Sequence, residues 1–186
     1  VACFGQNTGA LSVSIGGGTA PYQIHWNNNA AVPSLQNLAA GNYSATVGDA
    51  NGCTKTFAVA VTQPALLAAD TVLKTDPTCT GTLDGRIEVT MAGGTPPYHF
   101  NWSTGQSGAG LKALENQASG VFDVTVTDAN DCTLTLTGMA LEAPQLLTLT
   151  LDELLPADCY GAATGSIAVS VGGNVGSTQV TWNGQP

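Results

Sequence analysis

Hydrophobic and polar residues alternate in several short runs along the chain. Ile87, Val89 and Met91 alternate with polar neighbours, and the same pattern recurs at residues 98–102 and 122–126. A period of two is typical of a β-strand that turns one face toward a core. Clusters of Gly, Pro, Asn and Asp separate the runs and predict turns. No stretch carries a sustained 3.6-residue apolar stripe with helix caps. The pattern therefore predicts an all-β chain.

Two sequence motifs occur twice each. Gly-Gly-Thr-x-Pro-Tyr-x-x-x-Trp occupies residues 17–26 and again residues 93–102. Thr-Val-x-Asp-Ala-Asn-x-Cys occupies residues 46–53 and again residues 125–132, so the two motifs recur in the same order and at nearly the same interval. A third copy begins at Cys159. Such self-similarity indicates a tandem repeat.

The repeats predict three modules, which we place at residues 1–64, 65–143 and 144–186. The first lacks its first strand, the second is complete and the third is truncated. About seven short strands in each unit predict antiparallel β-sandwich modules of immunoglobulin-like or PKD-like build. Pro64 and Pro144 lie at the joints between modules, and proline there predicts short, stiff connections.

The five cysteines lie at repeating positions and predict disulfide-stapled modules. The natural pairs are Cys3–Cys53 and Cys79–Cys132, and Cys159 would pair beyond residue 186. Closing a loop of about 50 residues could add ~4 kcal/mol to the stability of a small module. Zinc is the rival interpretation, but zinc sites usually show paired Cys or His at short spacing, and none occurs in this sequence. Disulfides imply an oxidising, extracellular compartment.

The composition narrows the classes of partner. The formal net charge is −9, with 13 acidic and 4 basic residues. Such a surface repels nucleic acid and anionic membranes, so we expect neither as a partner. The sequence shows neither an apolar run long enough to span a membrane nor a basic-then-apolar leader. We interpret it as a piece of a larger mature chain.

Together these motifs resemble the SprB repeats of gliding-motility adhesins on the surface of Bacteroidetes cells and of related giant surface proteins. The family pattern runs from Cys-x-Gly through Asp-Gly-strand and Gly-Gly-Thr-x-Pro-Tyr-x-x-x-Trp to Val-x-Asp-x-x-Gly-Cys, and closes near Gln-Pro. Module 2 follows it through most of its length, and module 1 follows it from Cys3 to Pro64. Module 3 departs from it, because residues 174–176 read Asn-Val-Gly where Thr-x-Pro-Tyr is expected. The resemblance implies secretion through the type IX system and a role on the surface or in a filament.

Two acidic loops are candidate calcium sites. Asp49 and Asn51 in module 1, and Asp128 and Asn130 in module 2, offer clustered oxygens that could bind Ca²⁺. The same residues are typical of hairpin turns, in which Asp and Asn bond their own backbone and tolerate left-handed geometry. The turn accounts for these residues without a metal, so we expect no cofactor, with calcium as the alternative.

Each module contributes a tryptophan, at Trp26, Trp102 and Trp182. A repeated Trp could be a platform for sugar stacking, but its alternation with other apolar residues favours the core of a sandwich. His25 and His99 lie on the opposite strand face at positions that do not correspond, so a shared metal or catalytic role is not expected.

Three positions match glycosylation signals. Asn42 and Asn101 begin N-glycosylation triplets. Thr71 lies in an Asp-Thr-apolar triplet, at which the resemblance to Bacteroidetes surface proteins implies O-glycosylation. Thr71 is therefore the preferred candidate.

The sequence favours a structural and adhesive segment over an enzyme. No Ser, Cys or Asp nucleophile lies beside a recurrent base, and no paired carboxylates recur in the copies. The expected partners are neighbouring repeats or copies of the chain itself. The alternatives are a module that binds surface polysaccharide and a filament in which a strand completes a neighbour's module.

Overall fold

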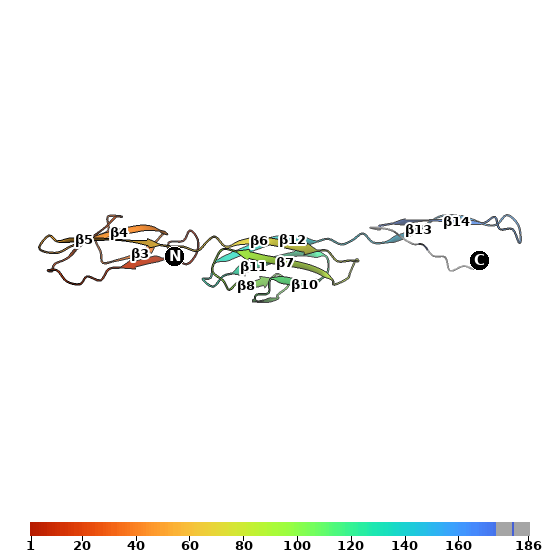
Figure 1. The fold of residues 1–186 in the computed structure, drawn as a ribbon. Coiled ribbons are helices and arrows are strands. Elements are labelled where there is room, and N and C mark those ends of the chain that lie inside the picture. The colour runs from red at the N-terminus through yellow and green to blue at the C-terminus, as the bar shows by residue number, and fades with distance from the viewer. Residues whose placement is uncertain (174–179, 181–186) are drawn as a thin grey trace. The chain divides into compact units, whose positions relative to one another are not determined.

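The computed structural model describes residues 1–173 and 180, and these contain β-strands and no helix (Figure 1). The predicted all-β fold is confirmed. Within this part of the chain there is accordingly no helix with the length and hydropathy needed to cross a membrane. Trp182 lies outside the described residues. The strands are β1 (Gly9–Ser12), β2 (Gln23–Trp26), β3 (Ser34–Leu38), β4 (Gly41–Gly48), β5 (Thr54–Val61), β6 (Ala68–Thr75), β7 (Gly85–Ala92), β8 (His99–Trp102), β9 (Ser107–Ala109), β10 (Ala113–Gln117), β11 (Gly120–Thr127), β12 (Thr133–Leu141), β13 (Thr148–Leu155) and β14 (Ser166–Gly172).

Each sheet contains strands of one repeat. Residues 1–64 form the sheets β1-β3 and β2-β4-β5, residues 65–143 form β10-β7-β6 and β12-β11-β8-β9, and β13 pairs with β14. The pairings are antiparallel. Module 2 has seven strands, as the repeat length predicts.

The chain forms two compact units. The first comprises Val1–Thr71, Val89–Lys112 and Val124–Leu136, and the second comprises Val72–Glu88, Ala113–Asp123 and Thr137–Pro186. Module 1 therefore belongs wholly to the first unit, and the strands of module 2 contribute residues to both.

Module 1 has its core between its two sheets. Trp26 of β2 and Ala45 of β4 are buried together with Leu35 and Leu38 of β3, and Leu11 of β1 packs against them. Because both sheets contribute side chains to one cluster, module 1 is a β-sandwich. Burial of a large apolar side chain contributes roughly 1.5–3 kcal/mol, so this cluster is the main source of its stability.

The buried residues of module 2 follow the predicted alternation. In the first unit they include Val89, Phe100, Trp102, Val124 and Val126, and in the second they include Ile87 and Leu114. Val89 and Met91 of β7 line a cavity with Phe100 of β8 and with Tyr98, which directly precedes β8. Since β7 and β8 belong to different sheets, apolar faces of the two sheets oppose each other there.

Module 1 starts one strand later than module 2. Gly9 of β1 occupies the repeat position of Gly85 of β7. Strand β7 pairs with β10 on one side and with β6 on the other, whereas β1 pairs with β3 alone. One edge of β1 therefore lacks a strand partner within the described part of the chain.

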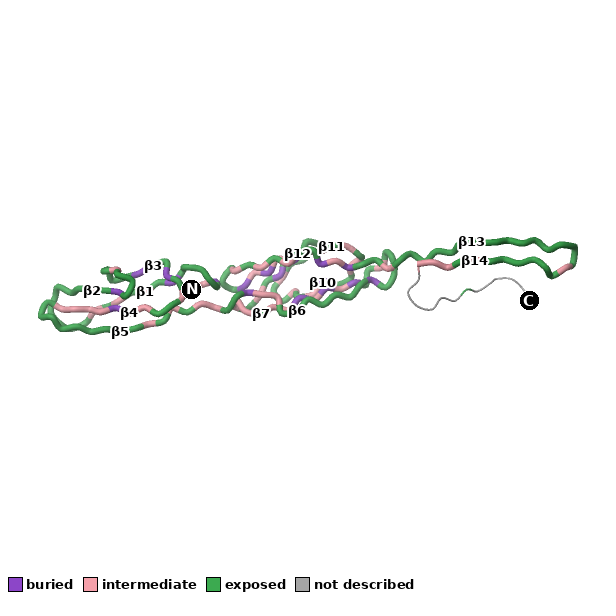
Figure 2. The backbone as a smooth tube through the Cα atoms, turned by 90° about the horizontal axis from the view of Figure 1, so that it is seen from above, coloured by how far each residue is buried: buried purple, intermediate pink, exposed green. Residues whose placement is uncertain are grey.

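Strands β13 and β14 form a hairpin that corresponds to β6 and β7. Ile167 occupies the repeat position of Ile87, yet Ile167 is 51% exposed and Ile87 is fully buried. The β13 strand is exposed along its length (Figure 2). In module 2, the strand face that carries Ile87 is therefore buried by the other strands of the module and not by the β6–β7 hairpin itself.

Candidate functional site

The recurrent polar residues and cysteines form two kinds of loop. Residues 3–6, 79–82 and 159–162 each form a tight turn closed by a backbone hydrogen bond, which we call the Cys turn. Residues 49–53 and 128–132 each connect two strands and form what we call the Asp loop.

The Cys turn of module 1 is linked covalently to the Asp loop of module 2. Cys3 and Cys132 form a disulfide across 129 residues of sequence, with Cα atoms 5.7 Å apart. The predicted pairs Cys3–Cys53 and Cys79–Cys132 are therefore wrong. Cys53, Cys79 and Cys159 are exposed free thiols. The disulfide bridges two modules instead of closing one.

The length of strand β5 explains why Cys3 does not reach Cys53. Cys53 directly precedes β5, and Gln63 lies beyond its other end. The Gly5 N–H donates to Gln63 Oε1 at 2.8 Å, so the Cys turn is at the far end of the strand. An eight-residue strand spans about 25 Å, whereas a disulfide requires Cα atoms within about 7 Å. The two cysteines of module 1 are thus at opposite ends of its sandwich.

A carboxylate organises the Asp loop of module 2. Asp128 Oδ1 accepts from the backbone N–H groups of Asn130 at 2.8 Å and Cys132 at 2.9 Å. Its Oδ2 accepts from the N–H of Thr95 at 2.8 Å. The side chain thereby holds the backbone of Cys132 in place and ties the loop to the Gly-Gly-Thr segment.

Asp128 is a buried charge, only 4% exposed. Burial works to raise the pKa of its carboxyl, but the hydrogen bonds from Cys132, Thr95 and Asn130 outweigh it and hold the pKa below its usual value. The group is therefore ionised at neutral pH, and its charge is matched by three donors.

Asn130 connects the two modules beside the disulfide. Its Nδ2 donates to Thr95 Oγ1 at 2.9 Å within module 2 and to the carbonyl of Ala2 at 3.0 Å in module 1. The N–H of Gly94 donates to the carbonyl of Ala65 in the connecting segment at 2.9 Å. These bonds and the disulfide together fix the joint.

Gly93 lies where the connecting segment crosses the Gly-Gly-Thr loop. Its φ is 67°, and a Cβ placed there would overlap the carbonyl oxygen of Leu66. We expect Gly93→Ala to lower the melting temperature more than Gly105→Ala, measured by differential scanning calorimetry. Gly105 is the matched control, because its φ is 86° but its Cβ would meet open space. The left-handed conformation alone costs about 1–2 kcal/mol at either position, so equal losses would contradict a close crossing at Gly93.

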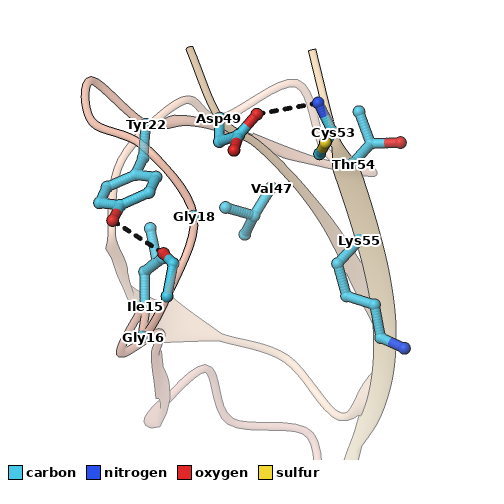
Figure 3. Close-up of a pocket in the computed structure, with 10 residues that line it drawn as sticks. Ile15, Gly16, Gly18, Tyr22, Val47, Asp49, Cys53, Thr54 and Lys55 are labelled. Atoms are coloured by element: carbon cyan, nitrogen blue, oxygen red, sulfur yellow. Dashed lines mark hydrogen bonds between the residues drawn. The ribbon is translucent and has the colours of Figure 1, made fainter. Parts of the chain in front are cut away.

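The Asp loop of module 1 repeats this geometry without a disulfide. Asp49 Oδ1 accepts from Asn51 N at 3.0 Å and Cys53 N at 2.9 Å, and its Oδ2 accepts from Thr19 N at 3.1 Å. The hydrogen bond from Cys53, followed by that from Thr19, lowers the pKa of Asp49. Figure 3 shows Asp49 beside Cys53 at the rim of an open pocket that Gly18 and Tyr22 also line.

These contacts give the four calcium candidates a structural role. Both carboxylates point their oxygens at backbone N–H groups, and Asn51 and Asn130 donate their side-chain amides to Thr19 and Thr95. In the described residues no three His, Cys, Asp or Glu side chains are grouped to hold a metal ion. Calcium remains an alternative for the loops, and a melting temperature that EDTA leaves unchanged would contradict it.

Trp26 and Trp102 belong to the core, as their alternation predicts. Trp26 and Trp102 are 3% and 2% exposed. Each indole Nε1 donates to a backbone carbonyl, of Val32 at 2.9 Å and of Leu111 at 3.0 Å. Rings buried in this way are not available to stack on a sugar. His25 and His99 are exposed.

The glycosylation candidates are all exposed on strands. Thr71 lies on β6, and its Oγ1 is 2.6 Å from Thr90 Oγ1. Asn42 lies on β4 and Asn101 on β8.

Comparison with known proteins agrees with the repeat pattern. No curated protein matches the chain significantly. Among solved structures, the amphioxus IgVJ-C2 molecule is similar over 73% of this chain and 97% of its own, with 13% identity and a TM-score of 0.36. Residues 1–31 and 71–107 match the SprB repeat family. The matched segments begin in module 1 and return in module 2, which supports the predicted resemblance of both modules to SprB-type repeats.

Proposed function

We propose that the chain is a structural and adhesive segment of a secreted, repetitive cell-surface protein or extracellular filament. The observation that carries this proposal is the joint, where a disulfide and the Asn130 bond to Ala2 connect one repeat to the next. The residues that recur in each repeat serve to fold the module and to connect it to the next. Such a repeat is typical of a spacer that holds a chain away from the cell.

Further support comes from the compartment and from the family. A disulfide is typical of proteins exposed to an oxidising environment, and SprB repeats occur in cell-surface adhesins. We therefore propose an extracellular or surface location, secretion through the type IX system and a role in the gliding motility of a member of the Bacteroidetes. The recurrent residues serve structure, so we propose no catalytic activity.

Neighbouring repeats and copies of the chain are the partners that we propose. Binding of surface polysaccharide remains the alternative function, and retention of the chain on a glycan array would support it. The indoles of Trp26 and Trp102 are buried, so in modules 1 and 2 specificity for a glycan would have to come from variable loops.

Immunogold electron microscopy of the producing cells tests the proposed function. Antibodies raised against the 186-residue chain are expected to label stalks or fibres that project from intact cells, and brief protease treatment of the cells is expected to remove the label. Label confined to the cell interior, or found only on isolated compact particles, would contradict the proposal.

We also propose that Thr71 carries an O-linked glycan in the native protein. Its exposure on β6 makes the hydroxyl accessible, and Thr90 can still donate its own proton to the substituted oxygen. The intact mass of the protein from its natural source is expected to exceed that of the polypeptide. Thr71→Ala should remove the excess and Thr90→Ala should not. A native mass equal to the bare polypeptide would exclude the modification.

A further inference from the structure

The three Cys turns have one geometry. The carbonyls of Cys3, Cys79 and Cys159 each accept from the backbone N–H three residues later, at 3.2, 3.2 and 3.0 Å. The glycine two residues after each cysteine has a positive φ, of 74°, 85° and 82°. The turns at Cys79 and Cys159 therefore have the same backbone conformation as the turn that presents Cys3 to Cys132. Of these three cysteines, only Cys3 forms a disulfide within the described chain.

The two Asp loops also share one geometry. The aspartate N–H donates to the carbonyl of the loop cysteine at 3.0 Å in module 1 and at 2.9 Å in module 2. The carboxylate accepts from the N–H of that cysteine at 2.9 Å in both. Cys53 is therefore held in the same way as Cys132, and Asn51 holds Thr19 as Asn130 holds Thr95.

The joint that follows module 2 repeats the joint that precedes it. A Cβ on Gly173 would overlap the carbonyl oxygen of Leu146, as one on Gly93 would overlap that of Leu66. Gly173 and Leu146 occupy the repeat positions of Gly93 and Leu66.

Cys79 lies at this second joint. It lines a cavity together with Gly173 and Leu146, and Thr80 Oγ1 donates to the carbonyl of Pro144 at 2.9 Å. At the first joint, the Gly-Gly-Thr segment (residues 93–95) lies beside the Cys turn. Asp128 and Asn130 connect this segment to the Asp loop that contains Cys132. Cys79 is thus placed toward module 3 as Cys3 is placed toward module 2.

We propose that a disulfide links each pair of successive modules, from the Cys turn of one module to the Asp loop of the next. Cys79 bonds to the Asp-loop cysteine of the third repeat, Cys53 bonds to the Cys-turn cysteine of a preceding repeat, and Cys159 bonds to the module after its own. At each joint two thiols lose two protons and two electrons and form one S–S bond. A disulfide oxidant such as oxidised glutathione accepts the electrons and is reduced to two thiols.

This arrangement deepens the proposed function, on which its biological meaning rests. A tandem protein in which every joint is cross-linked keeps neighbouring modules together when one of them opens. The pairing itself is a matter of covalent connectivity, which can be measured whether or not the protein adheres to anything.

A tandem version of the full chain tests the pairing. Residues 64–143 are inserted a second time after Ala143, which supplies Cys79 of the first copy with a complete following module. Cys53, Cys159 and the second-copy Cys79 are replaced by serine. The protein is refolded in reduced and oxidised glutathione, alkylated and digested with trypsin without reduction. The two copies of Cys132 fall in different tryptic peptides, because one continues into the inserted segment and the other into module 3.

The expected products are Cys3 linked to the first Cys132 and Cys79 linked to the second Cys132. Alkylated Cys79 should fall at least about tenfold relative to the chain without the insertion, since structural disulfides resist reduction by glutathione. Cys79 linked to Cys132 of its own copy, or Cys79 recovered alkylated beside an intact Cys3–Cys132 bond, would overturn the proposal. Neither outcome would bear on where the protein lies in the cell, which the immunogold experiment decides.

Discussion

Cys3→Ser is expected to destabilise the first compact unit by roughly 4–5 kcal/mol, because the cross-link closes a long loop in the unfolded chain. The bond spans 129 residues, and the entropy that closing such a loop removes from the unfolded chain grows slowly with its length. Thermal unfolding of the oxidised protein, followed by calorimetry, measures the loss. Addition of a reducing agent to the wild-type protein should reproduce it.

Cys53→Ser is the matched control for this prediction. Cys53 is exposed and unpaired, so its replacement should leave the melting temperature unchanged. If Cys3 were paired with Cys53 inside module 1, the two variants would lose the same stability. Equal losses would therefore contradict the bond between modules, whereas a loss confined to Cys3→Ser and Cys132→Ser supports it.

Asp128→Asn is expected to cost about 3 kcal/mol, because it removes a buried charge that three N–H donors surround, and hydrogen bonds to charged groups are worth about 1.5–3 kcal/mol each. The amide that replaces the carboxylate must also turn an N–H toward one of these donors, the N–H of Thr95 or those of Asn130 and Cys132. Denaturant unfolding of the oxidised protein measures the change. Asp131→Asn is the control, since Asp131 is exposed and has a positive φ, which asparagine tolerates.

The same carboxylate makes stability depend on pH. The pKa of Asp128 is lower in the folded protein than its ordinary value near 4 in an unfolded chain. Its contribution is therefore complete above about pH 4–5 and is lost as the pH falls through the folded pKa. The melting temperature of the wild type should fall in acid, and Asp128→Asn should fall less. Asp49 and Asp84 also have lowered pKa values, so the variant keeps part of the dependence. A wild-type profile that is flat down to about pH 3 would contradict this account.

The strands and the buried residues could be predicted from local pattern. Alternation placed Val89, Phe100 and Val124 on inward faces, and all three are buried in the fold. The repeat placed equivalent turns at Asp49 and Asp128, which hold the same hydrogen bonds. These features depend on neighbours close in sequence, where a period of two or a turn motif carries the information.

The pairing of the cysteines could not be predicted in this way. Spacing gives the same repeat interval whether Cys3 bonds within its own module or across the joint. The choice depends on which ends of which strands meet, and sequence separation does not encode that. The contact of Asn130 with Ala2, 128 residues apart, was missed for the same reason.

By itself, the sequence determined a repetitive, antiparallel β-protein with Trp26, Phe100 and Trp102 in the core and with Asp49 and Asp128 in turns. Only the tertiary structure decided that Cys3 meets Cys132, which made the joint between modules, and not the single module, the place where the cross-link lies. The physical reason is the length of the β5 strand. It holds the Cys turn and the Asp loop of module 1 about 25 Å apart, far beyond the reach of a disulfide, while the next module brings its own Asp loop to Cys3.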